Sequence, residues 1–202
     1  MKKTISQEQY KTILDNKNCK CRYFENFLKE DESQKLMDEL SKINYTVDKV
    51  KIFGKTIDSP RKVAAFSSDE KTYSYAGYTR GSIKWTPELL KIKEKLEKLF
   101  GETFNYALVN RYNDGSDYIG WHADDEKDIK KGSSILSVSL GQKRKFSIKD
   151  KETGKEKYDI ELGNGSLISM EGDMQQFYKH CISRSKKEMT VRYNITFRNI
   201  IS

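Results

Sequence analysis

Apolar residues follow a helical period in two stretches of the first hundred residues. In residues 31–43, Leu36, Leu40 and Ile43 lie three or four positions apart, behind an acidic first turn. In residues 87–100 the same spacing recurs, and Pro87 stands at the start. This period places the apolar side chains on one face of a helix. The pattern therefore predicts two amphipathic helices whose apolar faces support the core.

From residue 103 onward the pattern changes to short alternating segments separated by turns. A polar, glycine-containing stretch at residues 150–155 is expected to join two paired strands. Many short strands without βαβ alternation are typical of a sandwich or jelly roll. No Pro-, Gly- or Ser-rich tract divides the 202 residues, so a single α+β domain is expected. The predicted strands are residues 104–112, 133–140, 144–148, 158–162, 166–170, 177–181 and 188–200.

The three cysteines and the absence of long apolar runs indicate an intracellular protein. No apolar run reaches the roughly 20 residues of a membrane span, and the N-terminus lacks the apolar stretch of a signal peptide. Cys19 and Cys21 are too close for an ordinary disulfide, and Cys181 makes the count odd. Reduced thiols are therefore expected. Cys-x-Cys without a neighbouring histidine is a weak zinc signal.

The charge balance favours a polyanionic partner. Lys and Arg number 38 against 30 acidic residues, which gives a net charge of +8. Such an excess suits nucleic acid, because binding to phosphates releases counterions. A lysine-rich solvated surface without a partner would show the same charge balance. The placement of the charges must therefore decide between the two interpretations.

The chain has only two histidines, His122 and His180, and both suit a metal site. Alternate residues of an extended segment face one way, so His122 and Asp124 can point to the same side. A distant strand can then supply His180. Two imidazoles and one carboxylate leave three positions of the metal open, which is the ligand set of the non-heme Fe(II) oxygenases. The residues therefore predict a catalytic iron centre.

Two arginines near the C-terminus suit a dicarboxylate. Arg192 and Arg198 are six residues apart and would lie on one face of a strand. A guanidinium presents a planar fork that matches carboxylate or phosphate. One end of a dicarboxylate can bind the metal while the other end takes an arginine.

Several runs together resemble the AlkB family of Fe(II)/2-oxoglutarate dioxygenases over residues 50 to 201. The resemblance implies a double-stranded β-helix, a jelly roll that holds iron between its two sheets, and the use of Fe(II), 2-oxoglutarate and O2. It assigns the metal to His122, Asp124 and His180. The runs that carry it are Asn110-Arg111-Tyr112, Asp114-Gly115, Ile119-Gly120-Trp121-His122-Ala123-Asp124-Asp125-Glu126, His180 and Arg192-Tyr193-Asn194-Ile195-Thr196-Phe197-Arg198.

The resemblance also assigns the cosubstrate residues. Asn110 and Tyr112 match an Asn-x-Tyr that hydrogen-bonds 2-oxoglutarate. Arg192, Asn194 and Arg198 match the ending that anchors its carboxylates, so Arg198 is expected to take part in catalysis. Which arginine takes which carboxylate stays open.

Further matches point to the DNA-repair members of the family. Arg61, Tyr73 and Tyr75 lie in segments that resemble those around the nucleotide pocket, where aromatic rings hold an extruded base. Asp125 and Glu126 match polar residues that contact the base edge. Because the chain has 12 tyrosines, each one can equally be a core residue.

The segment Ile52-Phe53-Gly54-Lys55 resembles the hydrophobic finger of duplex-acting AlkB homologues. Phe53 would fill the gap that a flipped base leaves, and nearby lysines would bind phosphates. A hairpin whose Phe53 packs inward is the alternative. Lys186 and Lys187 match part of a basic loop that grips the undamaged strand, although Ser185 stands where that branch has a third basic residue.

The resemblance implies an oxidative demethylase that repairs 1-methyladenine and 3-methylcytosine in DNA. A monomer acting on nucleic acid, with duplex DNA preferred and no membrane partner, is expected in the cytoplasm, or in the nucleus of a eukaryote. An RNA or tRNA demethylase or hydroxylase, a protein hydroxylase and a catalytically silent nucleic-acid-binding protein are the alternatives. Within the domain 1–202, we expect an N-terminal helical extension (1–48), nucleotide-recognition segments with a support helix (49–102) and a jelly-roll catalytic core (103–202).

Overall fold

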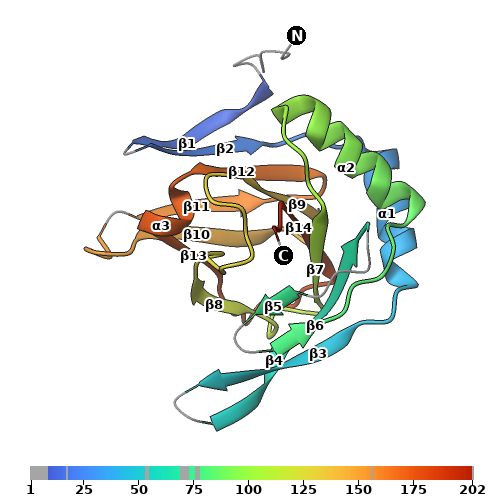
Figure 1. Ribbon diagram of the computed structural model, residues 1–202. Coiled ribbons are helices and arrows are strands. Elements are labelled where there is room, and N and C mark those ends of the chain that lie inside the picture. Colours follow the sequence, from blue (N-terminus) through green and yellow to red (C-terminus); the bar gives the residue numbers. More distant parts are fainter. Residues whose placement is uncertain are drawn as a thin grey trace.

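A computed structural model describes residues 9–16, 18–52, 55–68, 73–75, 78–155 and 157–201 of the chain. Side chains at 50–52, 55, 73–75 and 78–80 are not part of this description. The helices and strands are labelled in Figure 1. They are β1 (Lys11–Asn16), β2 (Cys19–Phe24), α1 (Glu30–Ser41), β3 (Thr46–Ile52), β4 (Lys55–Ser67), β5 (Tyr73–Tyr75), β6 (Tyr78–Arg80), α2 (Pro87–Phe100), β7 (Tyr106–Tyr112), β8 (Ile119–His122), β9 (Ile135–Gly141), β10 (Arg144–Asp150), β11 (Lys157–Leu162), β12 (Ser166–Gly172), α3 (Met174–Phe177), β13 (Tyr178–Ile182) and β14 (Arg192–Arg198).

The strands form two main antiparallel sheets. The larger sheet has eight strands in the order β1-β2-β12-β9-β14-β7-β4-β3. The smaller sheet has four strands in the order β11-β10-β13-β8, and β5 pairs with β6. Between β7 and β14 the chain crosses repeatedly from one main sheet to the other, so residues far apart in sequence face each other across the interior. The described part of the chain is mostly antiparallel sheet with few helices.

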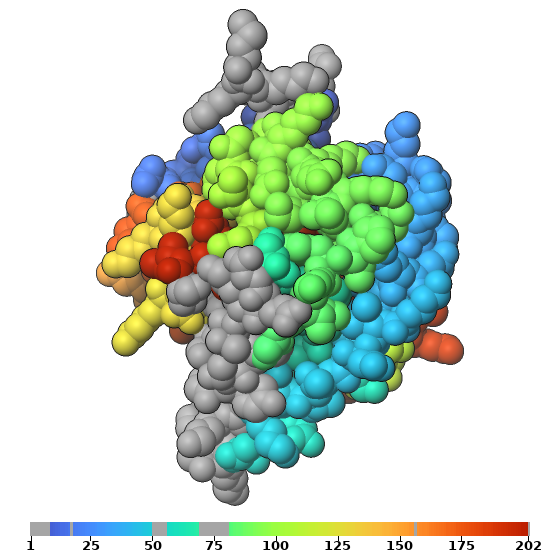
Figure 2. All heavy atoms as spheres, turned by 45° about the vertical axis from the view of Figure 1, so that its right-hand side comes forward, coloured from blue at the N-terminus to red at the C-terminus, as the bar shows by residue number. Residues whose placement is uncertain are grey.

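Two apolar clusters explain how the layers hold together. The first contains residues from both sheets, such as Leu108, Ile148 and Ile168. The second packs the opposite face of the larger sheet against α1 and α2, with Leu36 and Leu96 buried there. Because side chains of a strand alternate, strands such as β7 and β12 contribute residues to both clusters. Figure 2 shows the helical side, with α1 in light blue and α2 in green.

Both predicted helices are confirmed. The helix expected at residues 31–43 is α1, which ends at Ser41, and the second is α2 with the predicted bounds. The Glu39 side chain of α1 accepts hydrogen bonds from the backbone N–H groups of Glu88 (3.1 Å) and Leu89 (3.2 Å). These donors belong to the first turn of α2, where N–H groups lack helical partners and a carboxylate is favoured. Glu39 therefore joins the two helices.

The seven predicted strands are also confirmed, with bounds that differ by a few residues. The expected pairing across residues 150–155 is present, since β10 pairs with β11 and Ile148 lies opposite Tyr158. The description of residues 1–48 as helical needs correction, because β1 and β2 precede α1 and extend the larger sheet next to β12. In β2 the small apolar residues Cys19 and Cys21 alternate with charged ones, which is a weak strand signal.

The structure also tests the expectations for cysteines and membrane spans. All three cysteines are free and buried, as expected. None belongs to a cluster of metal-binding side chains in the described residues. Over the same residues, no helix has the length and apolarity that a transmembrane helix requires.

The strands that flank the predicted finger pair antiparallel. Ile52 of β3 lies opposite Lys55 of β4 in the backbone register. Phe53 and Gly54 lie between them, outside the described residues. β4 also pairs with β7, so this hairpin continues the larger sheet. The role predicted for Phe53 stays a prediction.

Candidate active site

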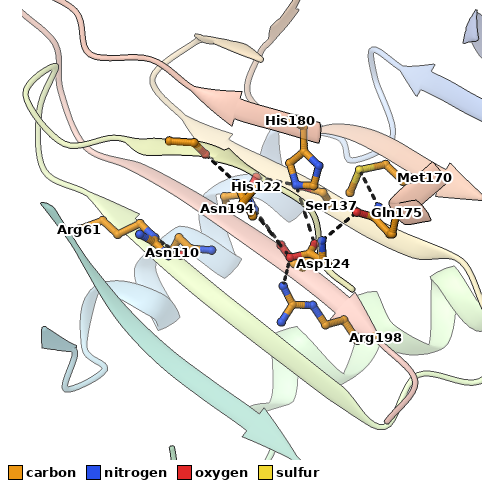
Figure 3. A network of polar contacts seen from close by, with 12 residues as sticks. Arg61, Asn110, His122, Asp124, Ser137, Met170, Gln175, His180, Asn194 and Arg198 are labelled. Carbon is orange, nitrogen blue, oxygen red and sulfur yellow. Dashed lines mark hydrogen bonds and ion pairs between the residues drawn. The ribbon is translucent and has the colours of Figure 1, made fainter. Parts of the chain in front are cut away.

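The two histidines and Asp124 come together between the sheets (Figure 3). His122 ends β8 and lies opposite His180 of β13 in the strand register. Asp124 follows just after the end of β8. One ligand atom from each of the three side chains lies within 4.8 Å of the others. The sequence prediction that these residues share one site therefore holds in the geometry, although Asp124 lies beyond the strand rather than within it.

The histidine side chains have nitrogen lone pairs available for a metal. His122 Nδ1 lies 2.9 Å from the Gly120 carbonyl oxygen, to which it can donate only when it carries the proton. That tautomer leaves the Nε2 lone pair available, 3.9 Å from Asp124 Oδ1. His180 Nε2 lies 3.9 Å from Asp124 Oδ2. These separations are too long for hydrogen bonds, so all three side chains keep electron pairs for an ion.

The protonation states of the two histidines and Asp124 also suit metal binding. Burial, and after it the neighbouring His122, lowers the pKa of His180 to about 3. Burial also lowers the pKa of His122, against the opposing effect of Asp124. Burial opposes ionisation of Asp124, but the Arg198 guanidinium and both histidines hold its pKa below the usual value. At neutral pH the site therefore offers two neutral imidazoles and one carboxylate, the forms that bind a cation.

Two further residues hold Asp124 in place. Arg198 Nη2 donates to Asp124 Oδ1 at 2.7 Å, and both side chains are only 3% exposed. The Asp124 backbone N–H donates to Gln175 Oε1 at 2.9 Å, and Gln175 Nε2 contacts Met170 Sδ at 3.4 Å. Contacts of this kind orient metal ligands and restrict their motion.

One face of β14 is polar where the core would otherwise be apolar. Tyr193, Ile195 and Phe197 pack into the helical cluster, so the intervening residues face the smaller sheet. These are Arg192, Asn194, Thr196 and Arg198. This alternation gives the predicted pair Arg192 and Arg198 its common face.

Arg192 is a buried cation whose hydrogen-bond donors are only partly satisfied. Its side chain is fully buried, and Nη2 donates to Ser139 Oγ (2.8 Å) and Asn194 Oδ1 (3.0 Å). Its Nε and Nη1 atoms have no hydrogen-bond acceptor among the described residues. Burial lowers the pKa of Arg192 to about 10, which still leaves it charged at neutral pH. A buried charge with unsatisfied donors is costly unless a ligand pairs with it, and a carboxylate fits this fork.

Asn110 and Arg61 contact each other directly. Arg61 Nε donates to Asn110 Oδ1 at 2.6 Å, and Arg61 Nη1 donates to Ser59 Oγ at 3.0 Å. Both residues are buried. The residue predicted for substrate and the residue predicted for cosubstrate therefore belong to one polar network at the wall of the site.

A cavity of about 40 Å³ lies beside these groups. Leu108, Phe146, Met170 and Ile182 supply apolar walls, and the metal-binding side chains supply the polar end. A larger groove of about 1090 Å³ lies elsewhere, along β1, β2, α2 and β11, and none of the predicted site residues lines it. The residues around the small cavity are Arg61, Leu108, Asn110, Tyr112, Ile119, His122, Asp124, Ser137, Phe146, Met170, His180, Cys181, Ile182, Asn194, Thr196 and Arg198.

The structure does not bring all predicted substrate residues to this cavity. Asp125 is exposed and pairs with Lys151 Nζ at 2.9 Å, and Glu126 is partly buried nearby. Lys186 and Lys187 are exposed in the segment between β13 and β14. Tyr73 and Tyr75 lie in β5, but their side chains are outside the description, as is Phe53.

Several site residues were not predicted from sequence. Gln175 lies in the short helix α3, where no motif marks it. Ser137 and Ser139 alternate in β9 and contact Asn194 and Arg192. Alternation along the strand places both serines on its inner face, so this pattern could have predicted them as site residues.

Arg184 was also missed. It precedes Ser185, the position where a basic residue was expected, and its Cζ lies 4.3 Å from the Tyr118 ring centroid. Arg184 therefore adds a cation to the exposed segment that carries Lys186 and Lys187.

Comparisons with known proteins agree with this geometry. The family model described as the 2OG-Fe(II) oxygenase superfamily matches residues 20–198. The mouse protein named DNA oxidative demethylase ALKBH2 is 36% identical over 181 residues, which covers 84% of this chain and 76% of that protein. The human ALKBH2 is 35% identical over 83% of this chain and 67% of its own length. The chain spans 63% of the bovine ALKBH2, so these relatives are longer.

A solved structure shares the fold. The structure of OsALKBH1 superposes with a TM-score of 0.67 at 18% sequence identity, covering 89% of this chain and 97% of that one. The His122, Asp124 and His180 cluster, the family match over nearly the whole chain and the similarity to ALKBH2 proteins lead to one assignment. The chain belongs to the AlkB homologues of the 2OG-Fe(II) oxygenase superfamily, a family of dioxygenases that use Fe(II), 2-oxoglutarate and O2.

Proposed function

We propose that this protein is an Fe(II)/2-oxoglutarate-dependent demethylase that repairs 1-methyladenine and 3-methylcytosine in DNA. The observation that carries the proposal is the cluster of His122, Asp124 and His180, and the buried, partly unsatisfied Arg192 of β14 supports it. The similarity to proteins named DNA oxidative demethylases supports the substrate class. With Fe(II), 2-oxoglutarate and O2 bound, such a site oxidises an N-methyl group, and the hydroxymethyl product releases formaldehyde and restores the base.

His122, Asp124 and His180 would hold the iron. Burial keeps both imidazoles neutral, and the Gly120 carbonyl fixes the His122 tautomer. Arg198 and Gln175 restrict Asp124, so the carboxylate is oriented before the metal arrives. A ligand set that is already oriented loses less conformational entropy on binding.

Arg192 is the arginine that we assign to the far carboxylate of 2-oxoglutarate. Its guanidinium donates to the neutral oxygens of Ser139 and Asn194 and forms no ion pair among the described residues, whereas Arg198 is already paired with the Asp124 carboxylate. Asn110 and Tyr112 line the cavity at the metal-binding side chains, and the Tyr112 ring centroid lies 5.2 Å from Arg192 Cζ, so these two residues would complete the cosubstrate site. On this assignment Arg198 acts mainly through Asp124.

We infer that the strands β7 to β14 form a double-stranded β-helix within one domain that covers residues 1–202. The alternation of these strands between the two sheets supports this. Duplex DNA is the proposed substrate of a monomeric, intracellular enzyme. The net charge of +8, the exposed Lys186 and Lys187, and the hairpin that flanks Phe53 support a duplex.

Formaldehyde release tests the proposal. A duplex with one 1-methyladenine should yield formaldehyde only with Fe(II) and 2-oxoglutarate, and His180→Ala should abolish the product while leaving the circular dichroism spectrum unchanged. A matched single-stranded RNA should react more slowly. Faster turnover of RNA would favour the RNA demethylase, and tight binding of the lesion without turnover would favour the silent binding protein.

A further inference from the structure

Arg144 is a buried cation that belongs to none of the metal or cosubstrate motifs. It begins β10, is only 3% exposed and forms no ion pair in the described part of the chain. Its guanidinium instead donates to three backbone carbonyls. Nη1 contacts Asp114 O at 3.0 Å, and Nη2 contacts Asp117 O at 2.9 Å and Ser183 O at 2.7 Å. Hydrogen bonds from a charged donor are among the stronger ones in proteins.

These carbonyls belong to two separate segments, which we call the turn (residues 113–118, after β7) and the basic loop (residues 183–191, after β13). The two segments also contact each other directly. The Ser185 backbone N–H donates to Gly115 O at 2.8 Å. A Cβ atom at Gly115 would lie 2.7 Å from Ser185 O and 2.9 Å from Lys187 O. Arg144 therefore spans a junction that is packed backbone against backbone.

Each segment leads to a different functional group. The turn follows Tyr112 directly, and the Tyr112 ring centroid lies 5.7 Å from Arg144 Cζ and 5.2 Å from Arg192 Cζ. The basic loop carries the exposed Lys186 and Lys187. One side chain thus reaches both the proposed cosubstrate wall and the backbone of the proposed nucleic-acid loop.

We propose that Arg144 is a positioning residue that couples the basic loop to the cosubstrate site. By holding the turn against the basic loop, Arg144 fixes Tyr112 on one side and the two lysines on the other. A displaced loop would then disturb Tyr112, and a displaced Tyr112 would disturb the loop. The inference rests on the proposed function, because it takes the roles of Tyr112, Lys186 and Lys187 from it.

Two variants perturb the junction from opposite sides. Arg144→Gln removes the charge and most of the bonds to the carbonyls, whereas Gly115→Ala keeps Arg144 and separates the two backbones. The matched control is Arg22→Gln. Arg22 is another largely buried arginine, with a two-point contact to Glu171 at 2.6 and 2.7 Å, but it lies in β2 and does not line the cavity.

The first readout is binding of 2-oxoglutarate to the Mn(II)-loaded protein by calorimetry, with the KM for 2-oxoglutarate and kcat measured alongside. Arg144→Gln and Gly115→Ala should each weaken 2-oxoglutarate binding about tenfold and raise its KM more than they lower kcat. Arg22→Gln should lower thermal stability without changing this affinity. A purely structural role for Arg144 would give Arg144→Gln the behaviour of the control, which would overturn the proposal.

The second readout is hydrogen exchange at the Ser185 amide. Both junction variants should accelerate this exchange by about tenfold or more, whereas Arg22→Gln should not. Faster exchange at Ser185 with unchanged 2-oxoglutarate affinity would also overturn the proposal, because the junction would then not reach Tyr112. If the wild-type protein itself binds no 2-oxoglutarate, the proposed function fails instead.

The third readout is affinity for a methylated duplex. Arg144→Gln and the double variant Lys186→Gln/Lys187→Gln should each weaken binding, and the triple variant should be little weaker than the double one. Residues that act through the same contact show such non-additivity. Strictly additive losses would mean that Arg144 does not act through the basic loop.

Discussion

At the scale of single residues, the active site depends on charges that the fold buries and then satisfies. Asp124 accepts a hydrogen bond from Arg198, and His122 donates to a carbonyl, so these two groups each have a partner that sets their orientation. Arg192 differs from Arg198, because its guanidinium donates to the neutral oxygens of Ser139 and Asn194 and forms no ion pair among the described residues. This difference is the basis on which we assign Arg192, and not Arg198, to the far carboxylate of 2-oxoglutarate.

Replacing Arg192 by lysine should therefore affect the cosubstrate selectively. An ammonium keeps the charge but cannot form a two-point contact with a carboxylate, so we expect the KM for 2-oxoglutarate to rise about tenfold or more. Steady-state kinetics with varied 2-oxoglutarate would measure this, and affinity for DNA should hardly change. Normal cosubstrate kinetics together with weaker DNA binding would identify Arg192 as a phosphate contact.

His180 should make the metal-free protein sensitive to acid. Its pKa is about 3 in the folded state against an ordinary value of 6.5, so the unfolded chain takes up the proton first. The associated stability is complete above pH 6.5 and is lost as the pH falls from 6.5 toward 3, by up to about 1.4 kcal/mol per pH unit. Urea unfolding at pH 7, 6 and 5, after a chelator has removed the metal, would measure this loss of stability. His180→Gln should flatten this dependence, and an unchanged slope would mean that His180 is not buried in its neutral form.

At the scale of secondary-structure elements, strand alternation gives β14 two different faces. Tyr193, Ile195 and Phe197 pack beneath the helices, while the residues between them face the site. The helices thus support the strand from behind and take no direct part in the chemistry. Contacts between the helices should accordingly affect stability without affecting metal binding.

Glu39→Ala tests this separation. The change removes the acceptor for two N–H groups in the first turn of α2, and loss of such a cap costs about 1 to 2 kcal/mol. Urea unfolding should show this loss, and the affinity for Mn(II) should stay within about twofold of the wild type. A large fall in Mn(II) affinity would mean that α2 controls the geometry of the metal site.

At the scale of the whole molecule, the hairpin of β3 and β4 extends the sheet that carries the active site. β4 pairs with β7, and β7 carries Asn110 and Tyr112. The tip of the hairpin, with Phe53, would therefore be attached to the active site through continuous sheet. A long hairpin joined in this way suits contact with a large, regular substrate such as a duplex.

Phe53→Ala tests whether the tip is an intercalating finger. Base–aromatic stacking is worth about 1 to 3 kcal/mol, so activity on a methylated duplex should fall by roughly ten- to a hundredfold. A single-stranded substrate has no vacated stack for Phe53 to fill, so activity on it should fall much less. Formaldehyde release from both substrates would measure the difference. Equal losses together with a large drop in Tm would show that Phe53 is a core residue.

The two helices, the seven strands predicted after residue 103 and the candidate metal-binding residues could all be predicted from the sequence. Local periodicity defines a helix or a strand, and His122, Asp124 and His180 are the rare side chains whose chemistry is specific. The strand β2 was missed because its buried residues Cys19 and Cys21 stand between charged ones, and β1 was missed because it buries only Leu14; both are weak local signals.

Only the tertiary structure decided which of the remaining polar residues share the site. Gln175 and Ser139 belong to none of the motifs and meet Asp124 and Arg192 only through tertiary contacts, which no local pattern specifies. Tertiary contacts also give the two arginines different partners. Asp124 forms an ion pair with Arg198 and not with Arg192. Sequence alone shows which chemical groups are present, whereas the fold decides which of them are left for a ligand, since that depends on distances across the sheets.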